Sequence, residues 1–168
     1  TCLCSITPDG HCGVTNHKTI NLKDTHYSLG VAANTYLEAG ADIIAPSDMM
    51  ENTTKYLKKT IGINGFIDAP IMSYSSKFKS NLYGPFREAA KSSPKGFDRS
   101  SYQLPVNDRE RAIKSSINNA AQGADYLMVK PGMTSIDLIA DIKSNTLLPT
   151  GVYQVSGEYA SMTLLNKE

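Results

Sequence analysis

One segment, Gly123-Ala124-Asp125-Tyr126-Leu127-Met128-Val129-Lys130-Pro131, indicates the fold class most clearly, and Gly40-Ala41-Asp42-Ile43-Ile44-Ala45-Pro46 repeats its design. In each segment a glycine is placed to end a helix, an acidic residue precedes a short apolar run, and a proline ends that run. Apolar runs without polar alternation are typical of parallel strands that are covered on both faces. The two segments therefore predict a chain of repeating strand–helix units.

Other short apolar runs extend this pattern along the chain. We predict strands at residues 2–5, 42–46, 66–74, 126–130 and 151–156. Between the runs at 66–74 and 126–130, Asn107 and Glu110 resemble a capping box that opens a helix ending at Gly123. That helix would carry Ile113, Ile117 and Ala121 on one face.

Two further helices follow from apolar residues at helical spacing. Five residues predict one that ends at Gly40: Leu29, Ala32, Ala33, Tyr36 and Leu37. A later helix, capped by Thr134 or Ser135, would turn four residues toward the core: Ile136, Leu138, Ile139 and Ile142.

The predicted class is α/β, with residues 1–168 forming a single domain. Two similar units about two βα repeats apart favour a (β/α)8 TIM barrel, and an open doubly wound sheet is the alternative. A closed barrel needs eight strands and about 250 residues. The five predicted strands therefore indicate part of a barrel, with strands missing at both ends.

The composition argues against two classes of binding partner. Seventeen Lys plus Arg against sixteen Asp plus Glu give a net charge of +1, which does not favour binding to nucleic acid or to an anionic membrane. The apolar runs have the length of strands rather than of membrane spans, and no signal peptide opens the chain. Because the chain starts without Met, we expect residues upstream. A cytosolic location is expected, or a plastid if the source is a plant or alga.

Cys2, Cys4 and Cys12 are the only cysteines in the chain, and they fall in its first dozen residues. Three thiolates can hold Zn²⁺ and leave its fourth tetrahedral position open, as in catalytic zinc sites. A strand at residues 2–5 would place Cys2 and Cys4 on one face, and a turn at residues 8–11 would return Cys12 to them. The alternative is three reduced cysteines that pack as small apolar side chains.

Two lysines lie where predicted strands end. Lys130 closes the run at 126–130, and Lys77 follows the run at 66–74. In a barrel this is the C-terminal rim, where a desolvated lysine can form a Schiff base with a ketone. A second lysine nearby would make deprotonation easier, because two cations resist sharing one cavity. The alternative for each is an exposed lysine, as we expect for Lys79.

Residues that could bind a substrate carboxylate are less distinctive. Arg87, Arg99 and Lys91 could do so, arginine in a bidentate manner, although each would more commonly be a surface ion-pair partner. Ser156, at another strand end, could donate a hydrogen bond. His11 lies close enough to the cysteines to touch a metal or its water.

The motifs together resemble those of the δ-aminolevulinic acid dehydratases, also called porphobilinogen synthases. The segments that carry the resemblance span almost the whole chain: Cys2-Leu3-Cys4, Gly10-His11-Cys12-Gly13, Ala45-Pro46-Ser47-Asp48-Met49-Met50, Met72-Ser73-Tyr74-Ser75-Ser76-Lys77-Phe78, Tyr83-Gly84-Pro85-Phe86-Arg87-Glu88-Ala89-Ala90, Asp98-Arg99, Tyr102-Gln103-Leu104-Pro105, Met128-Val129-Lys130-Pro131-Gly132 and Tyr153-Gln154-Val155-Ser156-Gly157-Glu158-Tyr159.

The resemblance implies a lyase of tetrapyrrole and haem biosynthesis, which condenses two 5-aminolevulinate molecules to porphobilinogen with loss of two waters. Lys130 would be the principal Schiff-base lysine and Lys77 the second. The resemblance also implies two residue sets: the catalytic zinc ligands Cys2, Cys4 and Cys12, and the substrate-binding residues Arg87, Arg99, Ser156 and Gln103.

The family assembles as a homo-octamer, and the resemblance places roughly strands three to seven of its barrel in this chain. The N-terminal arm that organises the octamer, and a substrate-binding tyrosine of the eighth strand, would lie outside residues 1–168. Ala120 stands where bacterial members carry an allosteric Mg²⁺ glutamate. Two alternatives remain: a class I aldolase-like barrel, which would not need the cysteines, and an inactive metal-binding fragment of the dehydratase.

Overall fold

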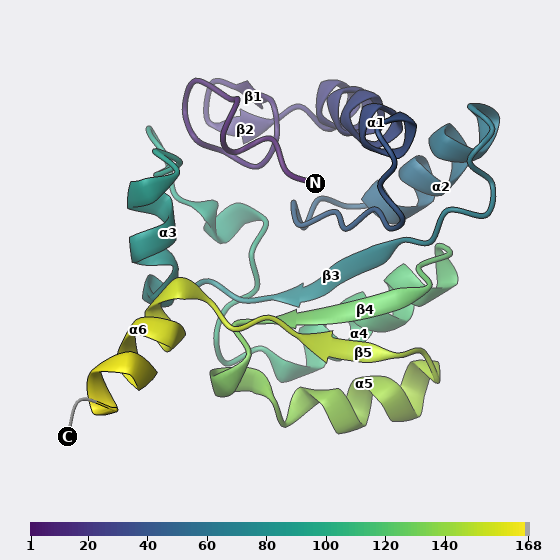
Figure 1. The fold of residues 1–168 in the computed structure, drawn as a ribbon. Helices are drawn as coiled ribbons and strands as arrows, with labels where there is room; N and C mark the ends of the chain where they lie inside the picture. Colours follow the sequence, from purple (N-terminus) through teal and green to yellow (C-terminus); the bar gives the residue numbers. More distant parts are fainter. Residues whose placement is uncertain (167–168) are drawn as a thin grey trace.

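A parallel sheet of three strands, β3 (Met72–Lys77), β4 (Tyr126–Lys130) and β5 (Thr150–Val152), lies at the centre of the computed structural model, which describes residues 1–166 (Figure 1). In the register, Met72 pairs with Tyr126 and Leu127 pairs with Thr150. The parallel arrangement and the strand at 126–130 are confirmed. The strand predicted at 66–74 instead begins at Met72 and continues through Lys77.

Two backbone segments extend this sheet beyond β3. Ile44 forms a parallel bridge with Ile71, and the Tyr74 amide donates to Pro46 O at 3.2 Å. On the other side of that segment, the Thr1 amino group donates to Ala45 O at 2.6 Å and Ser47 N donates to Thr1 O at 3.0 Å. The run predicted at 42–46 therefore lies next to β3, but it pairs too briefly to form a full strand.

The strand predicted at residues 2–5 is wrong. The amides of Ile6 and Thr7 both donate to Leu3 O at 2.9 Å, which folds the segment into a turn. A two-stranded antiparallel ribbon follows, made of β1 (Thr15–Asn16) and β2 (Thr19–Ile20).

The helices are α1 (Leu22–Glu38), α2 (Thr53–Ile63), α3 (Gly84–Ala89), α4 (Arg109–Ala121), α5 (Leu138–Thr146) and α6 (Ser156–Leu165), with short 3-10 turns η1 (Asn81–Tyr83), η2 (Arg99–Ser101) and η3 (Met133–Ser135). Gly40 and Gly123, just past α1 and α4, have φ of 94° and 96°, as expected for residues that end helices. None of the helices in residues 1–166 is long and apolar enough to cross a membrane.

The predicted caps need correction. Asp108, not Asn107, caps α4, because its side chain accepts from Arg111 N at 3.1 Å. Thr134 and Ser135 lie within η3 and do not cap α5. The strand predicted at 151–156 instead spans Thr150–Val152, and Ser156 begins α6, a helix that the periodicity did not indicate.

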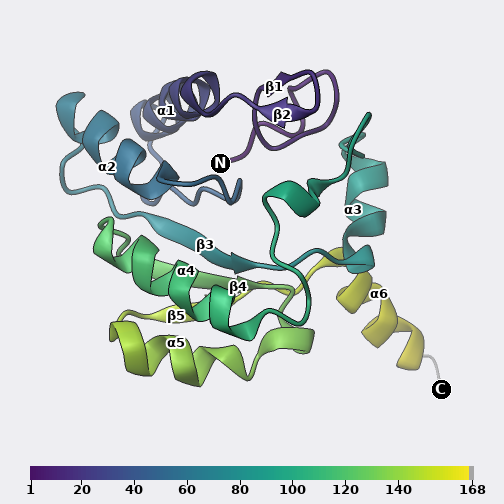
Figure 2. The same cartoon turned by 180° about the vertical axis from the view of Figure 1, so that it is seen from behind.

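Helices α4 and α5 cover one face of the sheet. Figure 2 shows α4 and α5 in front of the strands, and α1 and α2 beside the edge at β3. One apolar cluster joins α1 and α2 to Leu3, Ile44 and Ile71. Another joins α4 and α5 to Leu127 and Val129. Four residues of the predicted apolar helix faces are exposed: Tyr36, Ile117, Ala121 and Ile136.

Candidate active site

Lys77 and Lys130 lie side by side at the carboxyl ends of adjacent parallel strands. They are register partners, as the last residues of β3 and β4. Neighbouring strands are about 4.8 Å apart, so the two side chains leave the sheet close to each other. In Figure 1 these strands run toward α3 and α6, which places the lysines at that end of the molecule.

Aromatic rings surround the Lys130 amine. Its Nζ lies 3.8 Å from the ring centre of Tyr153, 5.5 Å from that of Tyr74 and 5.7 Å from that of Tyr83. Burial, and after it the charge of Lys77, lowers the pKa of Lys130 from the ordinary 10.5 to about 8. Near neutral pH this amine is therefore far more often unprotonated, and so nucleophilic, than an exposed lysine.

Lys77 is buried, with 6% of its surface exposed, and its Nζ donates to Ser47 O at 2.5 Å. The fully buried Asp48 follows Ser47 and accepts from Met50 N at 2.9 Å and from Thr53 Oγ1 at 2.7 Å. Burial raises the pKa of Asp48. Asp48 thereby fixes the loop whose carbonyl holds the second lysine.

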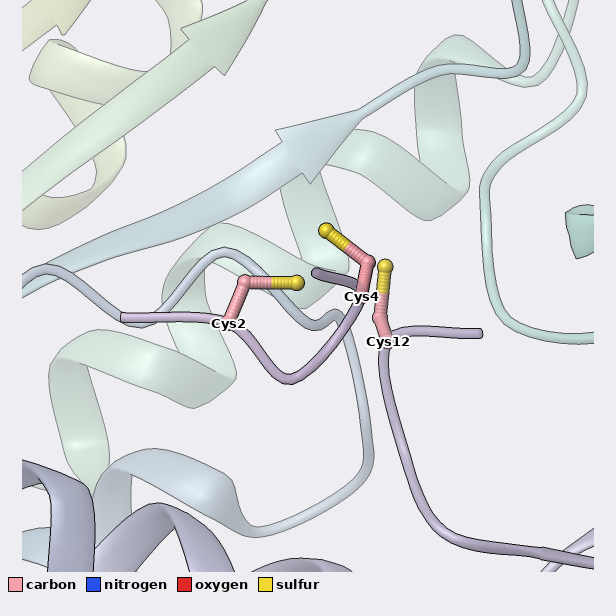
Figure 3. Close-up of side chains that lie close together, drawn as sticks. All are labelled: Cys2, Cys4 and Cys12. Atoms are coloured by element: carbon pink, nitrogen blue, oxygen red, sulfur yellow. The ribbon is translucent and has the colours of Figure 1, made fainter. Parts of the chain in front are cut away.

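The three cysteines converge in space, as the sequence predicted. One ligand atom from each lies within 4.8 Å of the others, and Figure 3 shows the three side chains side by side. The turn that replaces the predicted strand sends Leu3 into the apolar core and leaves Cys2 and Cys4 with Cys12. The Cys12 thiol, with burial as a further cause, raises the pKa of Cys2.

This donor set fits a zinc ion. Thiolates are preferred zinc ligands, and three of them leave one tetrahedral position for a water or a substrate atom. The cluster is also connected to the lysines. Thr1, next to Cys2, accepts from Ser47 N at 3.0 Å, and Ser47 in turn accepts from the Lys77 amine at 2.5 Å.

His11 supports the cysteine loop and lies outside the sulfur cluster. It is fully buried and stacks on Phe97 with 3.8 Å between ring centres. Its Nε2 lies 3.3 Å from Lys95 O, and its Nδ1 lies 3.0 Å from the Tyr102 hydroxyl, which also accepts from Cys12 N at 3.3 Å. A carbonyl can only accept, so Nε2 carries the proton and Nδ1 accepts from Tyr102.

The two candidate arginines come from segments that flank the lysines. The buried Arg99 donates from Nη2 to Gly10 O and to Ser92 O, both at 2.7 Å. Arg87 lies over the Tyr83 ring at 5.1 Å, and burial, followed by the charge of Arg99, lowers its pKa. The Nε atoms of both arginines are buried without a hydrogen-bond partner among the described residues.

Ser156 and Lys130 line one cavity. Its volume is about 390 Å³, and its wall consists of Tyr83, Phe86, Lys130, Tyr153, Gln154, Val155, Ser156 and Tyr159. The Ser156 hydroxyl accepts from Phe86 N at 3.0 Å. Gln103 is 3% exposed, and neither polar atom of its side-chain amide has a partner within residues 1–166.

The structure brings together the two lysines and the three cysteines that the sequence singled out, and it adds Asp48 and the tyrosines around Lys130, which sequence reasoning missed. Tyr74, Tyr83 and Tyr153 come from three separate segments, so no local pattern joins them. The available signal was weak: Tyr74 lies on the strand that ends at Lys77, and Tyr153 directly follows β5. Lys91 and Lys79 are exposed, and Lys79 pairs with Asp98 at 2.5 Å.

Comparison with known proteins gives one consistent result. The family model described as delta-aminolevulinic acid dehydratase matches residues 1–168. The chain is 48% identical over 160 residues to the delta-aminolevulinic acid dehydratase of Escherichia coli, covering 95% of this chain and 49% of that protein. It is 42% identical over 166 residues to the Helicobacter pylori protein of the same name, covering 99% of this chain and 51% of that protein.

A solved structure agrees. The delta-aminolevulinic acid dehydratase (porphobilinogen synthase) of Toxoplasma gondii, in complex with the reaction product porphobilinogen, superposes with a TM-score of 0.93 at 35% identity. The match covers 99% of this chain and 48% of that one, so the chain spans about half the length of these relatives. Its parallel sheet is part of a TIM barrel. The chain belongs to the delta-aminolevulinic acid dehydratase family.

Proposed function

We propose that the protein carrying this chain condenses two molecules of 5-aminolevulinate to porphobilinogen with loss of two waters, in tetrapyrrole biosynthesis. One observation supports this most strongly: Lys77 and Lys130 are register partners at the ends of adjacent strands, and one of them has a pKa of about 8. A reaction that joins two ketones through two imines needs two lysines close together. The E. coli and H. pylori relatives carry the name of this enzyme.

In the proposed mechanism, the neutral Lys130 amine attacks the ketone carbon of one 5-aminolevulinate. The resulting carbinolamine loses water to give an iminium, which acidifies the neighbouring carbon for C–C bond formation. Lys77 holds the other substrate molecule in the same way. Each lysine leaves when a substrate amine displaces it from its imine or when the pyrrole ring forms. Because each imine formation releases one water, two substrates yield one porphobilinogen and two waters.

The substrate carboxylates would bind to Arg87, Arg99, Gln103 and Ser156. The unpaired Nε atoms of the arginines and the unpaired amide of Gln103 support this assignment. A buried donor without a partner costs about 1–3 kcal/mol, and a carboxylate oxygen would remove that cost. Arginine also binds carboxylates in a planar, bidentate manner.

Cys2, Cys4 and Cys12 would hold the zinc ion. When bound, zinc supplies a Lewis acid with one open position for water or for the substrate amine. The cysteines' own role is to give up their protons and fix the ion beside the loop that holds Lys77. We also propose the family's homo-octamer as the assembly, with the cytosol, or a plastid in a plant or alga, as the location.

Reduction with borohydride tests this assignment, because it converts a lysine imine to a stable amine. After incubation with 5-aminolevulinate, peptide mapping by mass spectrometry should locate the adduct on Lys130. The Lys130→Ala variant should lose this adduct, and Lys79→Ala, which removes an exposed lysine two residues from Lys77, should retain it. Labelling of exposed lysines only, in a chain that folds and binds zinc, would favour the second candidate, an inactive metal-binding fragment.

A further inference from the structure

Glu158 is a buried carboxylate without a counter-charge. It is 2% exposed, and no lysine or arginine among residues 1–166 forms an ion pair with it. Glutamate is almost never this buried unless its charge is compensated. Here the compensation comes from three backbone amides that point at its two oxygens.

These amides belong to two different loops. Oε2 accepts from Val155 N at 2.7 Å and from Gly132 N at 3.3 Å, and Oε1 accepts from Met133 N at 2.6 Å. The bond to Val155 closes the first turn of α6. The other two reach the loop that begins directly after Lys130, so one carboxylate joins the end of β4 to the start of α6.

The two loops approach closely at Gly132. A Cβ on Gly132 would lie 3.3 Å from Tyr153 O and 3.4 Å from Gln154 N. Glycine is required where backbones approach in this way. Tyr153, the residue in contact with Gly132, also carries the ring that lies 3.8 Å from the Lys130 amine.

We propose that Glu158 is a positioning residue: its carboxylate holds the Lys130 loop against the segment 153–156 and thereby fixes the Lys130 amine over the Tyr153 ring and beside Ser156. The use of this arrangement in catalysis depends on the proposed function, whereas the positioning itself does not. Glu158→Gln tests it, because the amide keeps the volume but loses the charge and one acceptor.

Asp125 provides the matched control. It lies just before β4, at the end opposite Lys130, and its carboxylate accepts from Ile71 N at 2.8 Å and pairs with Lys58 at 2.9 Å. Asp125→Asn therefore removes an anchoring carboxylate from the same strand without touching the Lys130 loop. Both variants are compared below their melting temperatures.

The first readout is spectroscopic and needs no substrate. Lysines methylated with ¹³C-formaldehyde give one resonance each, and Lys130→Arg identifies the resonance of Lys130. Stacking on Tyr153 should shift its methyl protons upfield from those of the exposed Lys59. We expect Glu158→Gln to reduce this ring-current shift by at least about half and Asp125→Asn to preserve it. An unchanged shift in Glu158→Gln would overturn the proposal.

The second readout is borohydride trapping of 5-aminolevulinate at Lys130. A misplacement of about 1 Å can slow a reaction about 100-fold, so Glu158→Gln should lower the saturating trapping rate at least tenfold, with Asp125→Asn close to the parent chain. If the parent chain itself is not trapped, the proposed function fails for this chain, and the ring-current shift still decides the positioning role. Equal trapping rates in the parent chain and Glu158→Gln would contradict the proposal.

Discussion

At the scale of single residues, the chemistry depends on the environment of Lys130. Its amine lies among the rings of Tyr74, Tyr83 and Tyr153 and next to Lys77, and both burial and the neighbouring charge disfavour the protonated form. Because only the neutral amine attacks a ketone, the rate of borohydride-trapped labelling at Lys130 should rise with pH and level off above a midpoint near pH 8.

The rate of adduct formation at Lys130, measured from pH 6 to pH 10.5 by quantitative mass spectrometry, checks this prediction. An exposed lysine keeps a pKa near 10.4, so its labelling should still be rising at the end of that range. The labelling of Lys79, which is exposed, is measured in the same samples for comparison. A Lys130 profile that rises as late as that of Lys79 would contradict the environment described here.

The proposed zinc binding also depends on single residues. Replacing Cys4 with alanine removes one of three sulfur ligands, so the affinity for zinc should fall by more than about 100-fold, because outer-shell partners alone are worth 10–100-fold. Competition with a zinc chelator measures this affinity. Undiminished zinc binding in Cys4→Ala would leave the cysteines as packing residues.

Part of the site could be predicted from the sequence because its signals are local. Cys2, Cys4 and Cys12 are close along the chain, and Lys130 ends an apolar strand. The buried Asp48 and the three tyrosines could not be predicted in this way. Their roles arise from contacts between separate loops, which only the folded sheet brings together.

At the scale of elements, two neighbouring residues at the N-terminus of α4 differ in whether they cap the helix. Asp108 caps the helix, whereas Asn107, the cap expected from the sequence, is exposed. Asp108→Ala should therefore lower the free energy of unfolding by about 1 kcal/mol, and Asn107→Ala should leave it nearly unchanged. Urea unfolding followed by circular dichroism measures both, and equal losses in the two variants would contradict the assignment.

The elements differ in how far the sequence determines them. Residues 126–130 form a strand with the predicted bounds, because the short apolar run at 126–129 lies between the helix-ending Gly123 and Pro131. The segment 2–5 has an equally apolar start but folds into a turn, with Leu3 in the core. Helix α6 was missed because Gly157, a poor helix former, lies in its first turn, and its stabilising contact, from Glu158 to the loop after β4, is tertiary.

At the scale of the whole molecule, the chain supplies part of a barrel. Within residues 1–166, β5 pairs only with β4, and at the other edge Thr1 pairs with the segment 45–47. The parallel order of the strands was predictable from the repeated units, because parallel strands need helical crossovers. The sequence pattern alone left the barrel and the open sheet as alternatives, and the likeness to the T. gondii enzyme decides for the barrel.

The central claim is that two lysines and three cysteines form one site that acts on two substrate molecules. The most direct test is the intact mass of the zinc-loaded chain after incubation with 5-aminolevulinate and borohydride. We predict a species with two adducts on one molecule, at Lys77 and Lys130, which declines when zinc is removed. Adducts confined to exposed lysines, or a yield independent of zinc, would contradict the claim.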